Sequence, residues 1–364
     1  MSPDLQDHNT LLQNFPQKRG KFFLLAISEN SLILNSISIK TISKVHRFFL
    51  LRRGCGRYGK KMATWGKIKM LSDKKITHLL GFHKWDTAEQ DRVMQELVEA
   101  GEKYVVLNSG LLEDGCKKSD CLIDFHSRLK SAGLEFLDAH APWGVWADPG
   151  MPVKDFRDIM LCRHKIALNF CRIFGVTTLA FHTGNTTNHI FGSDLTLDDY
   201  YKALIEALEE LLPVAEKCNV TIALENQWTP LNHSSVLLQV MEYFNSPNLG
   251  LCYDSGHGNL TEKGAVAERS CVPARWKELG VPVKWEENLI EKFQPWLVNC
   301  HLTDNFGMTD EHLLPGKGNV DWSRIKRVLA GAERLHCIQN ECRLPEDMSV
   351  TEFCKGFRAG LGKM

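Results

Sequence analysis

Short apolar runs alternate with longer amphipathic segments along the chain from about Ile76 onward. The runs are too continuously apolar for strands that face water on one side, so they predict buried parallel strands. In the segments between them, apolar residues recur at the spacing of a helix that packs on a core. The predicted strands are 76–82, 103–109, 134–140, 176–182, 220–226, 249–257, 298–305 and 336–342. The predicted helices are 87–100, 121–132, 153–174, 197–217, 235–244, 289–296, 322–335 (after an N-cap at Asp321) and 350–361.

Eight strands that alternate with eight helices are typical of a closed (β/α)8 TIM barrel, because parallel strands need crossover helices. An open doubly wound sheet is the rival fold. It is disfavoured because no GxGxxG follows the first strand, and because nearly all strands end in polar residues. We therefore predict one α/β catalytic domain over 62–364. The stretch 258–288 is longer than a usual strand–helix loop, which predicts an insertion over the rim of the barrel.

The first 61 residues differ from the rest in charge. They carry 11 Lys and Arg against 3 Asp and Glu, and the remainder carries 33 against 41, although the whole chain is balanced at 44 each. This basic extension has no strand–helix rhythm, so we expect it to be disordered or outside the core, with Met62 as a natural start. A basic arm for nucleic acid or a membrane surface is the alternative. The acidic body makes nucleic acid an unexpected partner.

The cysteines and the hydropathy predict a reduced, cytoplasmic protein. None of the twelve cysteines forms a CxxC pair, and several lie inside predicted strands and helices, where cysteine behaves as a small apolar residue. No apolar stretch reaches the roughly 20 residues that span a bilayer, so no membrane partner is expected. The sequence leaves the oligomeric state open, a homo-oligomer included.

Four acidic or imidazole residues stand at the C-terminal ends of the last four predicted strands: Glu225, Asp254, His301 and Glu341. A parallel barrel places these strand ends on one rim, so the side chains are expected to converge. Carboxylates at such short distances repel one another, so one of them would keep its proton unless a cation balanced the charge. One divalent ion is therefore predicted. The oxygen-rich set suits Mn²⁺, Mg²⁺ or Co²⁺, and the imidazole leaves Zn²⁺ and Fe²⁺ open.

Further polar and aromatic side chains follow strand ends on the same rim and are candidates for substrate contact. A flat aromatic wall suits the apolar C–H faces of a sugar ring, but tryptophan also closes ordinary barrel mouths. His140 and His182 have a similar alternative, because they can cap the barrel core by hydrogen bonding. These candidates are His140, His182, His257, Asp310, His312, Trp143 and Trp228.

Five segments resemble motifs of the xylose-isomerase-like barrel superfamily, over about residues 76–361: ALEN, CYDSGH, HLTDN, DEHLLPGKGNVDW and NEC. This superfamily comprises sugar and sugar-phosphate isomerases and epimerases and the endonuclease IV type of abasic-site nuclease. The resemblance implies that one metal ion is held by Glu225, Asp254, His301 and Glu341. It also implies that the two glutamates act as acid and base on opposite faces of a small sugar, and that His257 contacts a sugar oxygen. Such an enzyme moves a proton beside a carbonyl through a metal-stabilised enediolate.

Two alternatives stay open. Residues matching all nine ligands of the three-zinc nuclease are present: His140, His182, Glu225, Asp254, His257, His301, Asp310, His312 and Glu341. The nuclease is disfavoured by the acidic body, by Leu-Leu-Pro in the last loop where the nuclease has a polar segment, and by a rim with tryptophans but no Arg/Lys stripe. A barrel that binds sugar without turnover is disfavoured by the intact acid, base and metal positions. The basic residue common after the histidine ligand in the epimerases is replaced by 305–307 (Asn-Phe-Gly), so no ketose is assigned.

Overall fold

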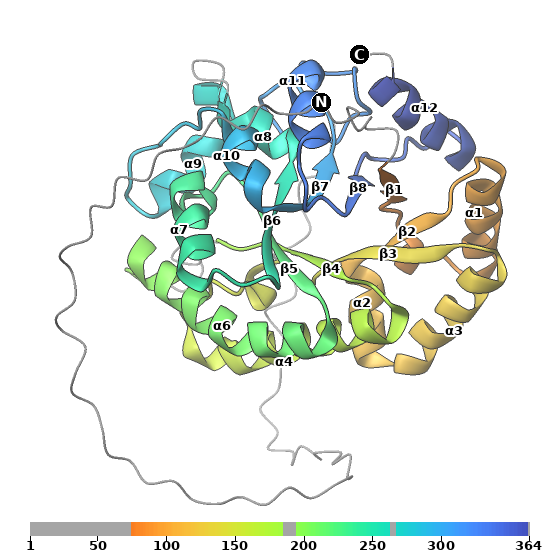
Figure 1. Cartoon of the computed structure of the whole chain (residues 1–364), viewed down its shortest axis with the longest axis horizontal. Coiled ribbons are helices and arrows are strands. Elements are labelled where there is room, and N and C mark those ends of the chain that lie inside the picture. Colours follow the sequence, from red (N-terminus) through yellow and green to blue (C-terminus); the bar gives the residue numbers. More distant parts are fainter. Residues whose placement is uncertain (1–73, 185–193, 263–266, 363–364) are drawn as a thin grey trace, which may run out of the picture. The chain divides into compact units, whose positions relative to one another are not determined.

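The computed structural model describes residues 74–184, 194–262 and 267–362. The expectations for 1–61 and for a start at Met62 therefore lie outside the described residues. Within them, eight parallel strands close into a barrel in chain order, and β1 pairs with both β2 and β8. Helices surround this central sheet (Figure 1). The predicted TIM barrel is confirmed.

Each strand is at most six residues long, which is shorter than most of the apolar runs. The run 249–257, for example, ends as a strand at Asp254 because Ser255 already begins the helix α8. The strands are β1 (Lys75–His78), β2 (Tyr104–Leu107), β3 (Glu135–His140), β4 (Thr178–Phe181), β5 (Thr221–Glu225), β6 (Leu249–Asp254), β7 (Leu297–Leu302) and β8 (Cys337–Asn340).

All eight predicted helices are present, and the described residues contain three others that were not predicted. The missed helix α2 contains Gly110 and Gly115, which lower helix propensity, but Asn108 caps it by accepting a 2.9 Å hydrogen bond from Leu111 N. The predicted N-cap Asp321 accepts from Arg324 N at 3.0 Å. The helices are α1 (Thr87–Glu99), α2 (Ser109–Lys117), α3 (Ser119–Ser131), α4 (Lys154–Phe174), α6 (Leu197–Cys218), α7 (Ser234–Phe244), α8 (Ser255–Glu262), α9 (Val272–Glu278), α10 (Leu289–Phe293), α11 (Trp322–Ala330) and α12 (Val350–Gly362). None of the helices in the described residues is long and apolar enough to cross a membrane.

The interior of the barrel is filled differently from the layer between sheet and helices. The outer layer is a large cluster of Leu, Ile, Val and Phe side chains. Inside the barrel, small residues such as Ala180, Ala223 and Cys252 form a separate cluster. Beside them Asn299 Nδ2 donates to Asp138 Oδ2 at 3.0 Å, and both residues are fully buried. Small and polar side chains thus leave room for larger polar side chains at the end of the barrel where the strands terminate.

A buried ion pair joins the C-terminal helix to the seam where β1 meets β8. Glu102, in the turn before β2, accepts from Arg358 of α12 through both of its oxygens, each at 2.5 Å. His78 Nε2, at the end of β1, lies 3.1 Å from Glu102 Oε2, and the His78 and Glu102 side chains are at most 1% exposed. Asn340 of β8 contacts His78 Nδ1 at 3.1 Å. The pair therefore connects elements from both ends of the described chain.

Candidate active site

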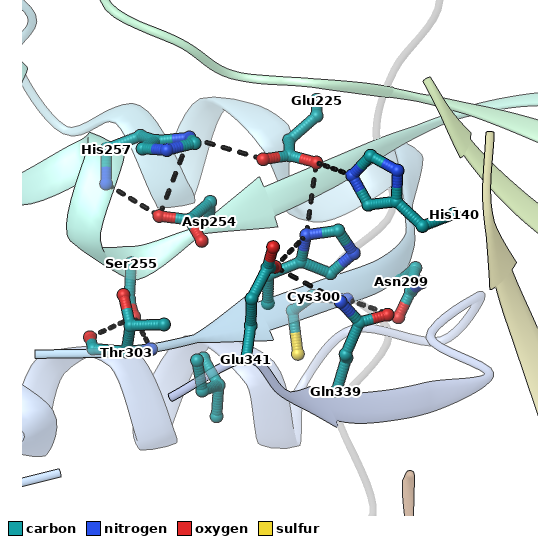
Figure 2. Close-up of polar contacts among 12 residues, drawn as sticks. His140, Glu225, Asp254, Ser255, His257, Asn299, Cys300, Thr303, Gln339 and Glu341 are labelled. Atoms are coloured by element: carbon teal, nitrogen blue, oxygen red, sulfur yellow. Dashed lines mark hydrogen bonds and ion pairs between the residues drawn. The ribbon is translucent and has the colours of Figure 1, made fainter. Parts of the chain in front are cut away.

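The four predicted metal-binding side chains lie together at the C-terminal ends of β5 to β8. His301 Nδ1 is 3.0 Å from Glu225 Oε2 and 2.6 Å from Glu341 Oε2. Asp254 joins them through His257, whose Nδ1 is 3.2 Å from Glu225 Oε1 and 3.6 Å from Asp254 Oδ1. Figure 2 shows Glu225, Asp254 and Glu341 pointing toward one space between the strands. Residues that are far apart in sequence thus form one compact cluster.

The donor set of this cluster fits a divalent cation. Both oxygens of Glu225, Asp254 Oδ2 and both nitrogens of His301 are buried and make no regular hydrogen bond among the described residues; the contacts of Glu225 and His301 are charge pairs with neighbouring imidazoles and carboxylates. Buried polar atoms that lack regular hydrogen bonds are costly, so such a concentration calls for an interaction of another kind. Three carboxylates and one imidazole supply oxygen and nitrogen ligands of the type that Mn²⁺, Mg²⁺, Co²⁺ and Zn²⁺ accept.

The charges of the carboxylates depend strongly on their neighbours. Burial opposes ionisation, but His301 and His182 hold the pKa of Glu225 well below its ordinary value. Burial likewise opposes the charge of Glu341, yet His301 lowers the pKa of Glu341 to about 2. Burial raises the pKa of Asp254 to about 6, with the Glu225 and Glu341 carboxylates acting in the same direction against an opposing His257. Positive charge from imidazolium groups stabilises these carboxylates, and a bound cation would supply the same stabilisation.

Two of the predicted substrate-contacting histidines lie on the β3 and β4 side of the cluster. His140 Nε2 and His182 Nε2 are 3.0 Å apart, and they lie 3.8 and 3.2 Å from Glu225 Oε2. Burial lowers the pKa of His140 to about 4. His140 is therefore neutral near pH 7 and can offer a lone pair.

A second group lies on the opposite side, after β6 and β7. His257 Nδ1 is 2.8 Å from Asn226 O, and its Nε2 is 3.3 Å from Asp310 Oδ2. Asp310 also lies 2.8 Å from His312 Nε2. His257, Asp310 and His312 thus form a chain of polar contacts that continues to the cavity.

The loop that carries Asp310 and His312 is organised by one carboxylate. Asp304, at the end of β7, accepts from Gly316 N at 2.8 Å and from the indole of Trp322 at 2.9 Å. Its backbone forms an antiparallel bridge with Leu313. Asp304 of HLTDN and Trp322 of GKGNVDW thus hold the two ends of the loop together, which gives these two motif residues a structural role.

An open cavity of about 420 Å³ lies over the cluster, within the size range of small-molecule sites. Glu341 is the member of the predicted metal set that lines the cavity, and the others are buried beneath it. Trp228 packs edge-on to His257 with ring centroids 4.8 Å apart, whereas Trp143 is 61% exposed at the mouth. The lining residues are Leu79, Ser109, His140, Trp143, His182, Gln227, Trp228, Thr229, His257, Arg275, Asp310, His312 and Glu341.

Several polar residues of this site were not predicted from the sequence, namely Ser109, Gln227, Thr229, Arg275 and Gln339. Gln339 is fully buried and donates from Nε2 to Glu341 Oε2 at 3.1 Å (Figure 2). Its position two residues before Glu341 was the available signal, because side chains two apart on a strand share a face. Arg275 lines the cavity from α9, a helix that was not predicted within the expected rim insertion 258–288.

Two known proteins are similar to this chain in sequence. The protein y4fM of Sinorhizobium fredii, uncharacterised, is 24% identical over 233 residues, which cover 58% of this chain and 68% of that protein. The protein MJ1311 of Methanocaldococcus jannaschii, also uncharacterised, is 28% identical over 125 residues, which cover 32% of this chain and 35% of that protein.

Solved structures with the same fold include three proteins at low sequence identity. A D-tagatose 3-epimerase-like protein has a TM-score of 0.55 at 18% identity, covering 80% of this chain and 98% of that one. The 3-keto-D-glucoside 4-epimerase of E. coli has a TM-score of 0.58 at 15% identity, covering 79% and 98%. The IOLI protein with a bound zinc atom has a TM-score of 0.57 at 17% identity, covering 80% and 98%.

A family model decides the classification. The model described as xylose isomerase-like TIM barrel matches residues 94–338, which is more than half of the chain. The fold, the match and the strand-end cluster agree, and the chain belongs to the xylose isomerase-like TIM barrel family.

Proposed function

We propose that this protein is a divalent-metal-dependent isomerase or epimerase of a sugar, sugar phosphate or cyclitol. The observation that carries the proposal is the pairing of two carboxylates, Glu225 and Glu341, on one imidazole at the floor of a small-molecule cavity. The structures of sugar epimerases with the same fold support it. The metal ion would be held by Glu225, Asp254, His301 and Glu341.

The chemistry requires a proton to leave a carbon beside a carbonyl. A bound divalent ion supplies stabilisation of the negative charge that develops on the oxygens of the enediolate. Glu341 lines the cavity and its low pKa keeps it ionised at neutral pH, so it can take the proton on one face. Glu225 would serve the opposite face. Return of the proton to the same carbon inverts it, and return to the neighbouring carbon isomerises the sugar.

His257 and the cavity walls position the substrate in this proposal. His257 Nε2 faces Asp310, and with Nδ1 engaged by Asn226 O the ring is held in one orientation. An imidazole held in this way can contact a sugar hydroxyl. The indoles of Trp228 and Trp143 offer apolar surface to the C–H face of a sugar. His140, His182 and His312 line the remaining wall.

The zinc-dependent abasic-site nuclease is kept as a second candidate because of a specific observation. His140, His182 and Glu225 form one group with metal-ligand spacing, and Glu225, Asp254 and His257 form another. The lining of the cavity favours the sugar enzyme, because Arg275 is the single Arg or Lys among the described lining residues. A nuclease needs several such side chains along the phosphate backbone.

Deuterium exchange tests the proposed reaction. The full chain with Mn²⁺ is incubated in D₂O with ketoses, aldoses, cyclitols and their phosphates, and proton NMR follows loss of a C–H signal. We expect exchange at a carbon beside a carbonyl for at least one substrate. Cleavage of abasic DNA without exchange in any sugar would contradict the proposal and support the nuclease.

Metal content gives the first prediction. We expect about one tightly bound divalent ion per chain, because the four strand-end ligands share one centre. Elemental analysis after dialysis measures this number, and Glu225→Gln or Asp254→Asn should lose the ion. The control variant Glu346→Gln, which alters an exposed glutamate after β8, should keep the metal ion. Three zinc ions per chain would instead indicate the nuclease.

The second prediction concerns Gln339, which we assign as a positioning residue. Gln339 is fully buried, and its amide holds Glu341 Oε2 in one orientation. Gln339→Leu removes that donor, so we expect Mn²⁺ affinity to fall by roughly 10- to 100-fold. Titration calorimetry measures the affinity. Gln294→Leu, which removes a glutamine donor to Val328 O away from the cavity, is the control and should bind Mn²⁺ normally. Equal affinity in Gln339→Leu and the unchanged protein would refute the role.

A further inference from the structure

The short helix α9 is fixed over the cavity by packing on one of its sides. Val272 and Trp276 are buried and cluster with Leu260, and Trp228 packs against the same cluster. Trp276 Nε1 also donates a 3.2 Å hydrogen bond to Trp228 O in the loop after β5. These contacts do not involve Arg275, so the position of the helix does not depend on that residue.

The start of α9 contacts the loop that carries Asp310, because Cys271 N, just before the helix, donates to Met308 O at 3.3 Å. Arg275 follows about one helical turn later, and its side chain is exposed outside the buried cluster. Arg275 lines the cavity together with Asp310 and His312. The helix therefore carries one guanidinium to the mouth of the site.

The charges around the cavity are divided between its floor and its mouth. The floor is formed by the carboxylates and imidazoles of the proposed metal site, whereas Arg275 is the single Arg or Lys among the described lining residues. The Arg275 side chain is 46% exposed and pairs with Glu278 on the same helix at 3.3 Å. A pair this exposed stabilises little, so an anionic group bound in the cavity can replace Glu278. A phosphate or carboxylate accepts two parallel N–H bonds from a guanidinium.

We infer that Arg275 determines substrate specificity by binding an anionic group, a phosphate monoester or a carboxylate, at the end of the sugar remote from the carbonyl. The inference rests on the proposed function, because it places the carbonyl at the floor beside Glu341. A substrate oriented in this way spans the cavity from the floor to the mouth. The substrate class is then sugar phosphates or sugar acids in preference to neutral sugars.

Binding of matched sugars tests this assignment. The full chain with Mn²⁺ is titrated by calorimetry with five- and six-carbon ketoses, each as the free sugar, the terminal phosphate and the terminal carboxylate. We expect an anionic member to bind at least about tenfold more tightly than its neutral partner, as a charge-assisted bidentate contact provides. Comparison of the phosphate with the carboxylate identifies the preferred anion. Arg275→Gln should abolish the preference, so that the anionic and neutral members of each set bind with similar affinity.

The controls separate a specific contact from a general effect of charge. Lys277→Gln removes the same charge from an exposed residue of α9 that does not line the cavity, so it should keep the preference. Arg275→Lys should keep only part of it, because an ammonium lacks the planar fork. The inference is overturned if no anionic sugar binds more tightly than its neutral partner, or if Arg275→Gln retains the preference. Anion binding that depends on Arg275 without deuterium exchange would support this inference while contradicting the proposed isomerase.

Discussion

Glu341→Gln is expected to slow deuterium exchange by about 10³-fold, within the range of 10²- to 10⁴-fold that acid–base groups contribute. Glutamine has nearly the same shape but cannot take a proton, and Glu341 is the metal-set carboxylate that lines the cavity. The measurement is the exchange rate of the best substrate at saturating Mn²⁺, so that weaker metal binding by the variant does not account for the loss.

Two further variants serve as comparisons for the exchange rate of Glu341→Gln. Glu346→Gln changes an exposed glutamate five residues later and should exchange at the rate of the unchanged protein. Glu225→Gln should lose both exchange and the metal ion, because Glu225 contacts His182, His257 and His301 at once. Full exchange by Glu341→Gln at saturating metal would remove Glu341 from the proton transfer and leave it as a ligand only.

The barrel could be predicted because its signal is repeated eight times. Nearly all apolar runs end in polar residues, and the alternation of strand and helix continues from 220–226 to 336–342. The strand-end cluster follows from this topology, since the parallel order brings Glu225, Asp254, His301 and Glu341 to one rim. Errors of one to three residues at the ends of these four strands did not matter for the cluster, because each ligand stands within one residue of the end of its strand.

The missed parts depend on contacts between segments that are distant in sequence. The helix α2 forms although it contains two glycines, because Gly115 allows Leu122 and Phe170 to pack closely against it. Arg275 reaches the cavity because Trp276 packs against the loop of Trp228, and no periodicity within 258–288 encodes that contact. Sequence patterns predict whether a segment is a helix or a strand, whereas the places of α2 and Arg275 are decided by what these segments pack against.

The buried carboxylate of Glu102, at the seam between β1 and β8, is expected to make the stability of the protein depend on pH. Burial opposes the charge of Glu102, but hydrogen bonds from His78 and Arg358 outweigh it and lower the pKa of Glu102 to about 2. Because this folded-state pKa is below the unfolded value, the ion pair stabilises the protein above about pH 4.5. The stabilisation is lost as the pH falls from about 4.5 to about 2, where Glu102 is protonated in both states.

Glu102→Gln is therefore expected to lower the free energy of unfolding by about 3 kcal/mol at pH 7, the lower end for breaking a buried pair, because Arg358 is partly exposed and keeps contact with water. Urea denaturation of the full chain at several pH values measures the difference. Glu135→Gln is the control, because it breaks an ion pair with Lys103 in which both side chains are 53% exposed, and it should change stability by less than about 0.5 kcal/mol. The difference between Glu102→Gln and the unchanged protein should shrink as the pH falls from 4.5 toward 2. A difference that stays constant over this range would mean that packing, and not the charge of Glu102, holds α12 against the seam.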